Sequence, residues 1–217
     1  MTRSRIAVPA LLLAALALSA CSSSSPGAST DKDDADQPLT KQFSQGEITQ
    51  AIPERGEAPA GYELSDLGKG RPGTADDCSH TEGESPRGWK VGGDTEYFYN
   101  GSSRSRKMSL NICQFNTSEN AKSAYTAWTH RSGLTDEGTK AKVGEESAFL
   151  LKNKSGSVYA YTRSGTVNIE VKIEDSGGDA TSAHDMLAAT LKRLEQVQAG
   201  KRPTATAADE AAKAEQQ

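Results

Sequence analysis

Residues 157–174 read SVYAYTRSGTVNIEVKIE, and this stretch decides the fold. From Thr166 to Glu174 apolar and polar residues alternate, the period of a strand with one buried face. The β-prone segment Ser157–Arg163 precedes it across a Ser164-Gly165 turn, and Glu146–Lys152 forms an earlier strand. The three segments predict an antiparallel meander. Its buried face would carry Val167, Ile169, Val171 and Ile173, and its solvent face Asn168, Glu170, Lys172 and Glu174.

A second pair of strands is predicted upstream. Thr95–Asn100 is aromatic and β-prone, and Lys107–Phe115 alternates Met108, Leu110 and Ile112 with polar residues. This register places Cys113 on the face opposite the apolar row.

Three segments have helical spacing. The first is Leu39–Ile52, which Pro53 ends. The second begins near Asn116 and ends at Gly133, and the third precedes Gly200. In the second helix Trp128 is most simply a core residue, and a ligand-stacking role is the alternative.

The elements predict an α+β domain, with antiparallel sheet or sheets and helices packed on one face. We expect one domain, residues 39–200, behind a flexible tether. The tail 201–217 lacks an apolar stripe, so we expect it to be disordered or a frayed helix.

The N-terminus has the features of a signal peptide over residues 1–20. Arg3 and Arg5 precede an apolar run from Ile6 to Leu18, and small residues follow at Ser19 and Ala20. The run is shorter than the roughly 20 residues that a membrane-spanning helix needs.

The sequence Leu18-Ser19-Ala20-Cys21 resembles the lipobox of bacterial lipoproteins. This resemblance implies cleavage before Cys21, lipidation of Cys21 and anchoring to the extracytoplasmic face of the cell membrane. Ordinary secretory cleavage, with Cys21 as a free thiol or disulfide partner, is the alternative.

Polar composition predicts a tether over 21–38, because the serine-rich and acidic sequence has no apolar periodicity. The chain has 25 basic and 29 acidic residues; removal of Arg3 and Arg5 leaves 23 against 29, a formal charge of -6. This charge argues against a nucleic-acid partner.

With Cys21 assigned to lipid, Cys78 and Cys113 remain as the possible internal pair. Outside the reducing cytosol we expect them to form a disulfide. The alternative is a free reactive thiol.

Potential ligating or catalytic residues do not follow a known spacing. The cluster Asp76, Asp77, Cys78, His80, Glu82 and Glu84 offers metal ligands, but a solvated acidic loop is the simpler interpretation. The 3 histidines, His80, His130 and His184, match no catalytic motif. The basic residues Arg104, Arg106 and Lys107 could meet an anionic ligand or simply be solvated. We therefore predict no catalytic residue, no metal and no cofactor.

The element Pro59-Ala60-Gly61-Tyr62, after a helix and before a cysteine-stapled domain, resembles actinobacterial, Streptomyces-like cell-envelope lipoproteins. Related domains are similar to extracellular sensor modules of mycobacterial Ser/Thr kinases. The resemblance implies a non-catalytic binding or sensing module for an envelope ligand or protein partner. A lipid or glycolipid carrier is the alternative, and an envelope hydrolase is a third possibility.

Overall fold

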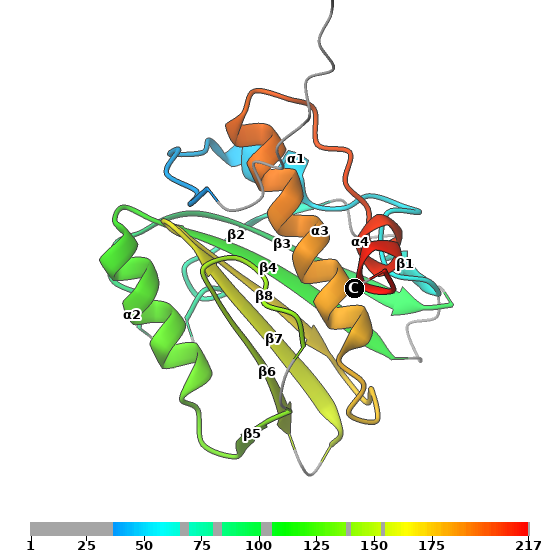
Figure 1. Ribbon diagram of the computed structural model, residues 1–217. Coiled ribbons are helices and arrows are strands. Elements are labelled where there is room, and N and C mark those ends of the chain that lie inside the picture. The colour runs from blue at the N-terminus through cyan, green and yellow to red at the C-terminus, as the bar shows by residue number, and fades with distance from the viewer. Residues whose placement is uncertain are drawn as a thin grey trace, which may run out of the picture. The chain divides into compact units, whose positions relative to one another are not determined.

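The computed structural model describes residues 37–65, 70–79, 84–100, 106–137, 140–152 and 155–216. The predicted signal peptide 1–20, the lipidation residue Cys21 and nearly all of the predicted tether 21–38 lie outside the described residues. The described chain forms an α+β domain built on an antiparallel sheet (Figure 1), which confirms the predicted fold class.

Within the described residues, eight strands form one sheet in the order β1-β3-β4-β8-β7-β6-β5, with β2 also paired to β3. The two predicted groups of strands are therefore continuous, because β4 pairs with β8. The strands are β1 (Tyr62–Leu64), β2 (Arg71–Gly73), β3 (Trp89–Tyr99), β4 (Lys107–Phe115), β5 (Leu134–Asp136), β6 (Glu146–Lys152), β7 (Ser157–Ser164) and β8 (Val167–Ile173).

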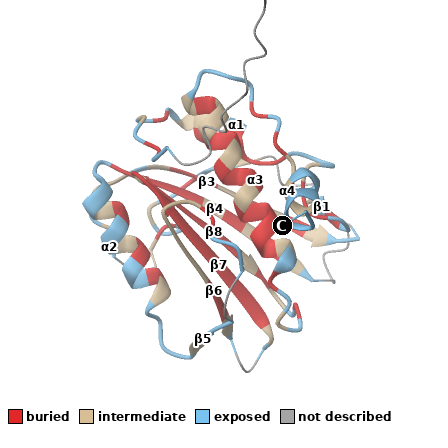
Figure 2. Ribbon diagram, viewed as in Figure 1, coloured by how far each residue is buried: buried red, intermediate tan, exposed pale blue. Residues whose placement is uncertain are grey.

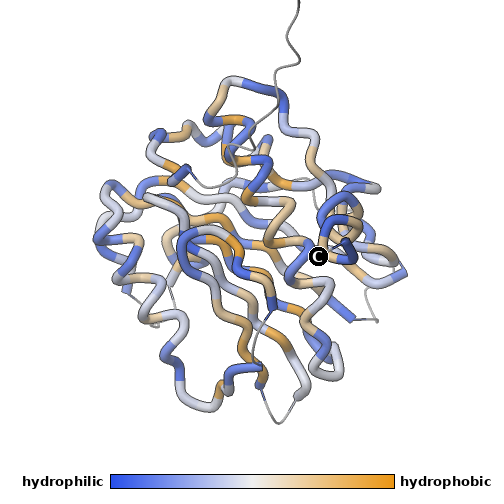
Figure 3. Tube along the Cα trace, in the orientation of Figure 1, coloured by the Kyte–Doolittle hydropathy of each residue, from blue (hydrophilic) through white to orange (hydrophobic). Residues whose placement is uncertain are grey.

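The helices of the described chain are α1 (Gln45–Ala51), α2 (Ser118–Thr129), α3 (Thr181–Gln198) and α4 (Ala207–Ala214). The apolar row of β4 and β8 packs against α1 and α3 in the main core. On the opposite face, α2 packs over Cys113, Phe115 and Tyr161. Figures 2 and 3 show the buried, apolar middle of the sheet between these layers. The helices are thus not all on one face.

The first helix is shorter than predicted, since it begins only at Gln45. Ser44 caps it and forms a capping box with Glu47. The preceding residues are not helical, because the sheet binds them. The Thr166 backbone N donates to Leu39 O at 2.9 Å, and the buried Gln114 side chain accepts from Phe43 N at 2.9 Å.

The prediction that the polar residues of β8 face solvent is wrong for the first two of them. Asn168 and Glu170 are 0% and 5% exposed. Asn168 Nδ2 donates to the Ala121 carbonyl of α2 at 2.8 Å, so the second helix layer covers this part of the strand. A strictly alternating sequence does not show that a helix covers its polar face.

The tail also differs from the disordered or frayed segment expected over 201–217. Residues 203–206 run alongside α3 and lead into α4, which Thr206 caps with Asp209. Ala205 and Ala207 are buried, and the Ala207 backbone N donates to Glu57 O at 2.9 Å. We call residues 203–216 the C-terminal arm. Backbone contacts fix the arm, which explains why it needs no apolar stripe.

Candidate functional site

Cys78 and Cys113 form a disulfide with a Cα–Cα distance of 5.8 Å. The bond joins the segment after β2 to β4 on the α2 face of the sheet, the face expected from the register of β4. Both residues are buried, so this pair is structural and leaves Cys78 no thiolate for a metal.

Trp128 is a core residue, as its helical spacing predicted. It is 1% exposed, and its indole Nε1 donates to the Cys78 carbonyl at 3.2 Å. Its ring lies 5.9 Å from that of Tyr161. A buried ring in these contacts has no face open for stacking on a ligand.

The acidic segment around Cys78 forms a turn. The Asp77 carboxylate accepts from the backbone N and the hydroxyl of Thr74, at 2.7 and 2.8 Å. His80 and Glu82 lie outside the described residues. Among the residues that the structure describes, no group of three or more His, Cys, Asp or Glu is placed to hold a metal ion.

The two described histidines lie on opposite faces of the sheet. His184 of α3 is buried, with Nδ1 3.1 Å from Asp185 Oδ1 and its ring against Phe149. His130 follows α2 on the other face of the sheet, where its Nδ1 lies 3.2 Å from the Thr129 hydroxyl. A histidine, a carboxylate and a hydroxyl therefore do not meet at one described place.

The described basic residues near the start of β4 already have partners. Lys107 Nζ lies 3.1 Å from Glu96 Oε1. The Arg106 guanidinium lies 5.4 Å from the centre of the Tyr99 ring, and Tyr99 in turn packs edge-on against Tyr62. Arg104 lies outside the described residues. The described members of the basic run thus stabilise this end of the sheet.

Sequence reasoning missed a buried carboxylate at the centre of the sheet. Glu170 of β8 accepts from Asn111 Nδ2 of β4 at 3.0 Å. Burial raises the pKa of Glu170, although hydrogen bonds from Asn111 and Tyr161 and the charge of Arg131 oppose the rise. A group with such a pKa is often functional, but Glu170 is only 5% exposed.

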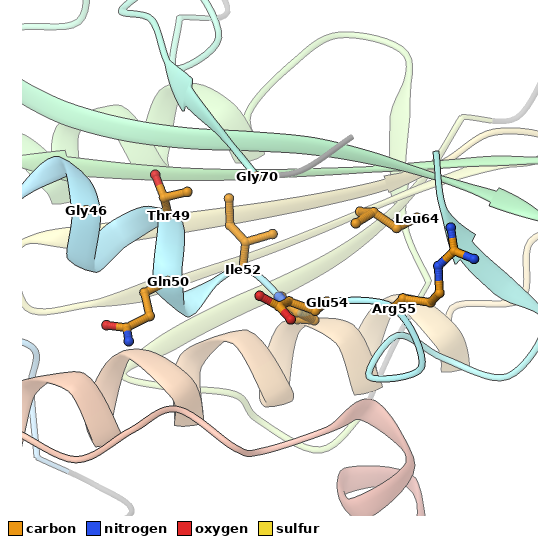
Figure 4. Close-up of a pocket in the computed structure, with 9 residues that line it drawn as sticks. Gly46, Thr49, Gln50, Ile52, Glu54, Arg55, Leu64 and Gly70 are labelled. Carbon is orange, nitrogen blue, oxygen red and sulfur yellow. The ribbon is translucent and has the colours of Figure 1, made fainter. Parts of the chain in front are cut away.

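A pocket of about 640 Å³ lies beside the C-terminal end of α1 (Figure 4). We call it the α1 pocket. Its apolar side chains, buried or half-buried, are Ile52, Pro53 and Leu64. Its polar side chains, half-buried or exposed, are Thr49, Gln50, Glu54 and Arg55.

Two glycines complete the lining of the α1 pocket. A Cβ built on Gly46 would have no atom within 4 Å, so this helical position faces open space. A Cβ on Gly70 would lie 2.6 Å from Ile52 Cδ1, so a side chain there would displace the pocket's apolar residue. The absence of a side chain at Gly46 thus leaves this side of the pocket open.

The pocket brings together residues from three places in the sequence. Thr49 and Gln50 come from α1, Leu64 from β1, and Gly70 immediately precedes β2. The Tyr97 hydroxyl donates to Pro53 O at 2.6 Å and holds the chain that leaves α1 against the sheet. The only sequence signal was the helix stop at Pro53 followed by a charged pair, which is too common to indicate a site.

The described helices include none long and apolar enough to cross a membrane. No protein-family model and no curated protein matches the sequence. Among solved structures, the chain is similar to the extracellular domain of PknH from Mycobacterium tuberculosis, with a TM-score of 0.48 and 12% sequence identity. The similarity covers 72% of this chain and 98% of that domain.

Proposed function

We propose that this protein is a membrane-anchored extracytoplasmic lipoprotein whose domain binds a small amphipathic envelope molecule in the α1 pocket, without catalysis. The observation that carries the binding proposal is the pocket itself, in which apolar Ile52, Pro53 and Leu64 lie beside four polar side chains. The lipobox-like sequence before Cys21 supports the anchor, and the Cys78–Cys113 disulfide is consistent with an oxidising compartment.

The size and lining of the pocket support a small ligand. Binding sites for small molecules occupy roughly 300 to 1,000 Å³ and combine an apolar surface with a few polar groups that fix orientation. The Gln50 amide and the charged Glu54 and Arg55 side chains would orient a polar group, while Ile52 and Leu64 would cover an apolar one. An amphipathic molecule satisfies both parts of the lining.

The same lining argues against the carrier alternative. An acyl chain prefers a wholly apolar cavity, because polar groups that it covers lose their hydrogen bonds to water. Of the seven side chains that line the α1 pocket in the described part of the chain, four are polar.

The non-catalytic part of the proposal rests on where the reactive groups lie. The His184–Asp185 pair is buried against Phe149 on the α3 side of the sheet, and the Glu170 carboxylate is buried on the α2 side. The α1 pocket is lined by other residues.

Native mass spectrometry tests the binding proposal. The sample is the chain from residue 21 on, with Cys21→Ser, secreted from a bacterial host and incubated with a small-molecule extract of bacterial envelopes. The Gly46→Trp variant is designed to occupy the pocket, since Gly46 lines it and a Cβ there would have no atom within 4 Å. Ala127→Trp, on the exposed side of α2, is the matched control.

We expect extra mass in the native but not the denaturing spectrum for the unsubstituted chain and for Ala127→Trp. Gly46→Trp should lose that mass while keeping a folded circular-dichroism spectrum. Retained ligand in Gly46→Trp, or no added mass in any sample, would contradict binding in the α1 pocket.

A further inference from the structure

A single buried arginine on α3 holds the wall of the α1 pocket. Arg193 is 3% exposed, and its guanidinium donates to three consecutive backbone carbonyls at the end of α1. The distances are 3.4 Å to Gln50 O, 3.0 Å to Ala51 O and 3.5 Å to Ile52 O. Gln50 and Ile52 both line the pocket.

The reason for this contact is the end of the helix. The last carbonyls of a helix lack partners within it and carry the negative end of the helix dipole. No basic residue lies in the last turn of α1, so the cap comes from α3 instead. Figure 4 shows α3 running beneath the pocket-lining residues.

The same guanidinium also holds the C-terminal arm. Arg193 Nη1 donates to Ala205 O at 3.1 Å and lies 2.9 Å from Glu57 Oε2. Glu57 also contacts both the pocket wall and the C-terminal arm. Its carboxylate accepts from the Glu54 backbone N at 2.6 Å, and its carbonyl accepts from Ala207 N at 2.9 Å.

We propose that the C-terminal arm regulates the α1 pocket, because the Arg193–Glu57 pair binds both. With the arm docked, Arg193 and Glu57 are held in place and order residues 50–54. Displacement of the arm removes the contacts at Ala205 and Ala207, loosens the pocket wall and weakens ligand binding. By linkage, an occupied pocket strengthens docking of the arm, so a partner that captures the arm would release the ligand. The regulatory part rests on the proposed function, but the structural coupling does not.

Amide hydrogen exchange measures the coupling without a ligand. The sample is again the chain from residue 21 on, with Cys21→Ser. In the Ala207→Glu variant, a charge at a buried position undocks the arm. Ala208→Glu adds the same charge to the same helix at an exposed position and is the matched control. A chain that ends at Arg202 removes the arm altogether.

We expect Ala207→Glu and the shortened chain to exchange about tenfold faster at residues 50–54. The amides of β4 and β8 should exchange as in the unsubstituted chain, which shows that the domain is intact. Ala208→Glu should leave residues 50–54 unchanged. Unchanged exchange at residues 50–54 in the shortened chain would overturn the proposal, and so would equal acceleration in the sheet, because the arm would then stabilise the whole domain alike.

Different results would contradict ligand binding in the α1 pocket and its regulation by the arm. If loss of the arm accelerates exchange at residues 50–54 but no ligand binds to the chain, the binding proposal is contradicted and the coupling between the arm and the pocket wall stands. If Gly46→Trp excludes the ligand, the binding site is supported. If that ligand then binds the full and the shortened chain with equal affinity, regulation of the site by the arm is contradicted.

Discussion

At the scale of single residues, buried polar side chains organise this domain more than their positions in the sequence indicate. Arg193, Gln114 and Asn168 are each almost fully buried, and each binds backbone groups of another segment. Burying such groups is costly unless they are hydrogen-bonded. Gln114 and Arg193 bind through several atoms, whereas Asn168 binds through Nδ2 and its buried Oδ1 has no hydrogen-bond partner among the described residues. Each therefore fixes the segment that it contacts in one position.

Glu170 is expected to make stability depend on pH. Its pKa in the folded chain lies above its ordinary value of 4.5, so the folded chain binds more protons than the unfolded chain between the two values. Stability should therefore fall as the pH rises through that window. The groups that act on the carboxylate are Asn111, Arg131, Tyr161 and Lys172.

The Glu170→Gln variant should lose this dependence and gain stability relative to the unsubstituted chain as the pH rises from about 4.5. Urea unfolding at several pH values checks it. Glu174→Gln is a control with the opposite pH dependence. The hydrogen bond from Lys172 lowers the pKa of Glu174, so the stability that Glu174 contributes is lost as the pH falls. A parallel pH profile for Glu170→Gln and the unsubstituted chain would contradict the prediction.

At the scale of elements, the sheet is covered on both faces. The alternation in β4 and β8 placed the main apolar row correctly, and Met108, Leu110, Ile169 and Val171 are all buried. The covering of the other face depended on α2, whose Trp128 and Tyr125 meet Phe115 and Tyr161. Because α2 brings its own apolar residues, polar residues beside them, such as Asn168, are buried as well.

The disulfide should stabilise this second layer. Cys78 and Cys113 are 35 residues apart, and closing such a loop contributes about 3 to 4 kcal/mol in the chain-entropy model. The Cys78→Ala, Cys113→Ala double variant should therefore unfold at lower urea, as should the unsubstituted chain under a reductant. The oxidised chain should also weigh two daltons less than the reduced one. Equal urea midpoints with and without reductant would contradict this contribution.

At the scale of the whole molecule, the proposed lipid anchor at Cys21 would decide where the domain acts. Cys21→Ala should move the protein from the membrane fraction to the soluble secreted fraction, because no acyl chains can be attached. Fractionation followed by immunoblotting measures the distribution. Ser22→Ala is the control, since it changes the neighbouring residue and keeps Cys21 and the disulfide. Membrane retention of Cys21→Ala would point to a different anchor.

The sequence predicted most of the strands and two of the helices because apolar periodicity is a local property. The strands Lys107–Phe115 and Glu146–Lys152 begin and end as predicted. The non-helical segment before α1 was predicted to be helical, since Leu39 and Phe43 have helical spacing but bind Thr166 and Gln114 of the sheet. A contact between residues so distant leaves no trace in a local pattern.

By itself, the sequence determined the α+β class, the alternating inner face of the sheet and the partner of each internal cysteine. The tertiary structure alone decided that α2 covers the second face, that the C-terminal arm is ordered and that a pocket lies beside α1. The physical reason is the range of the interactions. Periodicity and turn residues act between neighbours, whereas Arg193 joins Ala51 to Ala205, and only the folded chain brings those three residues together.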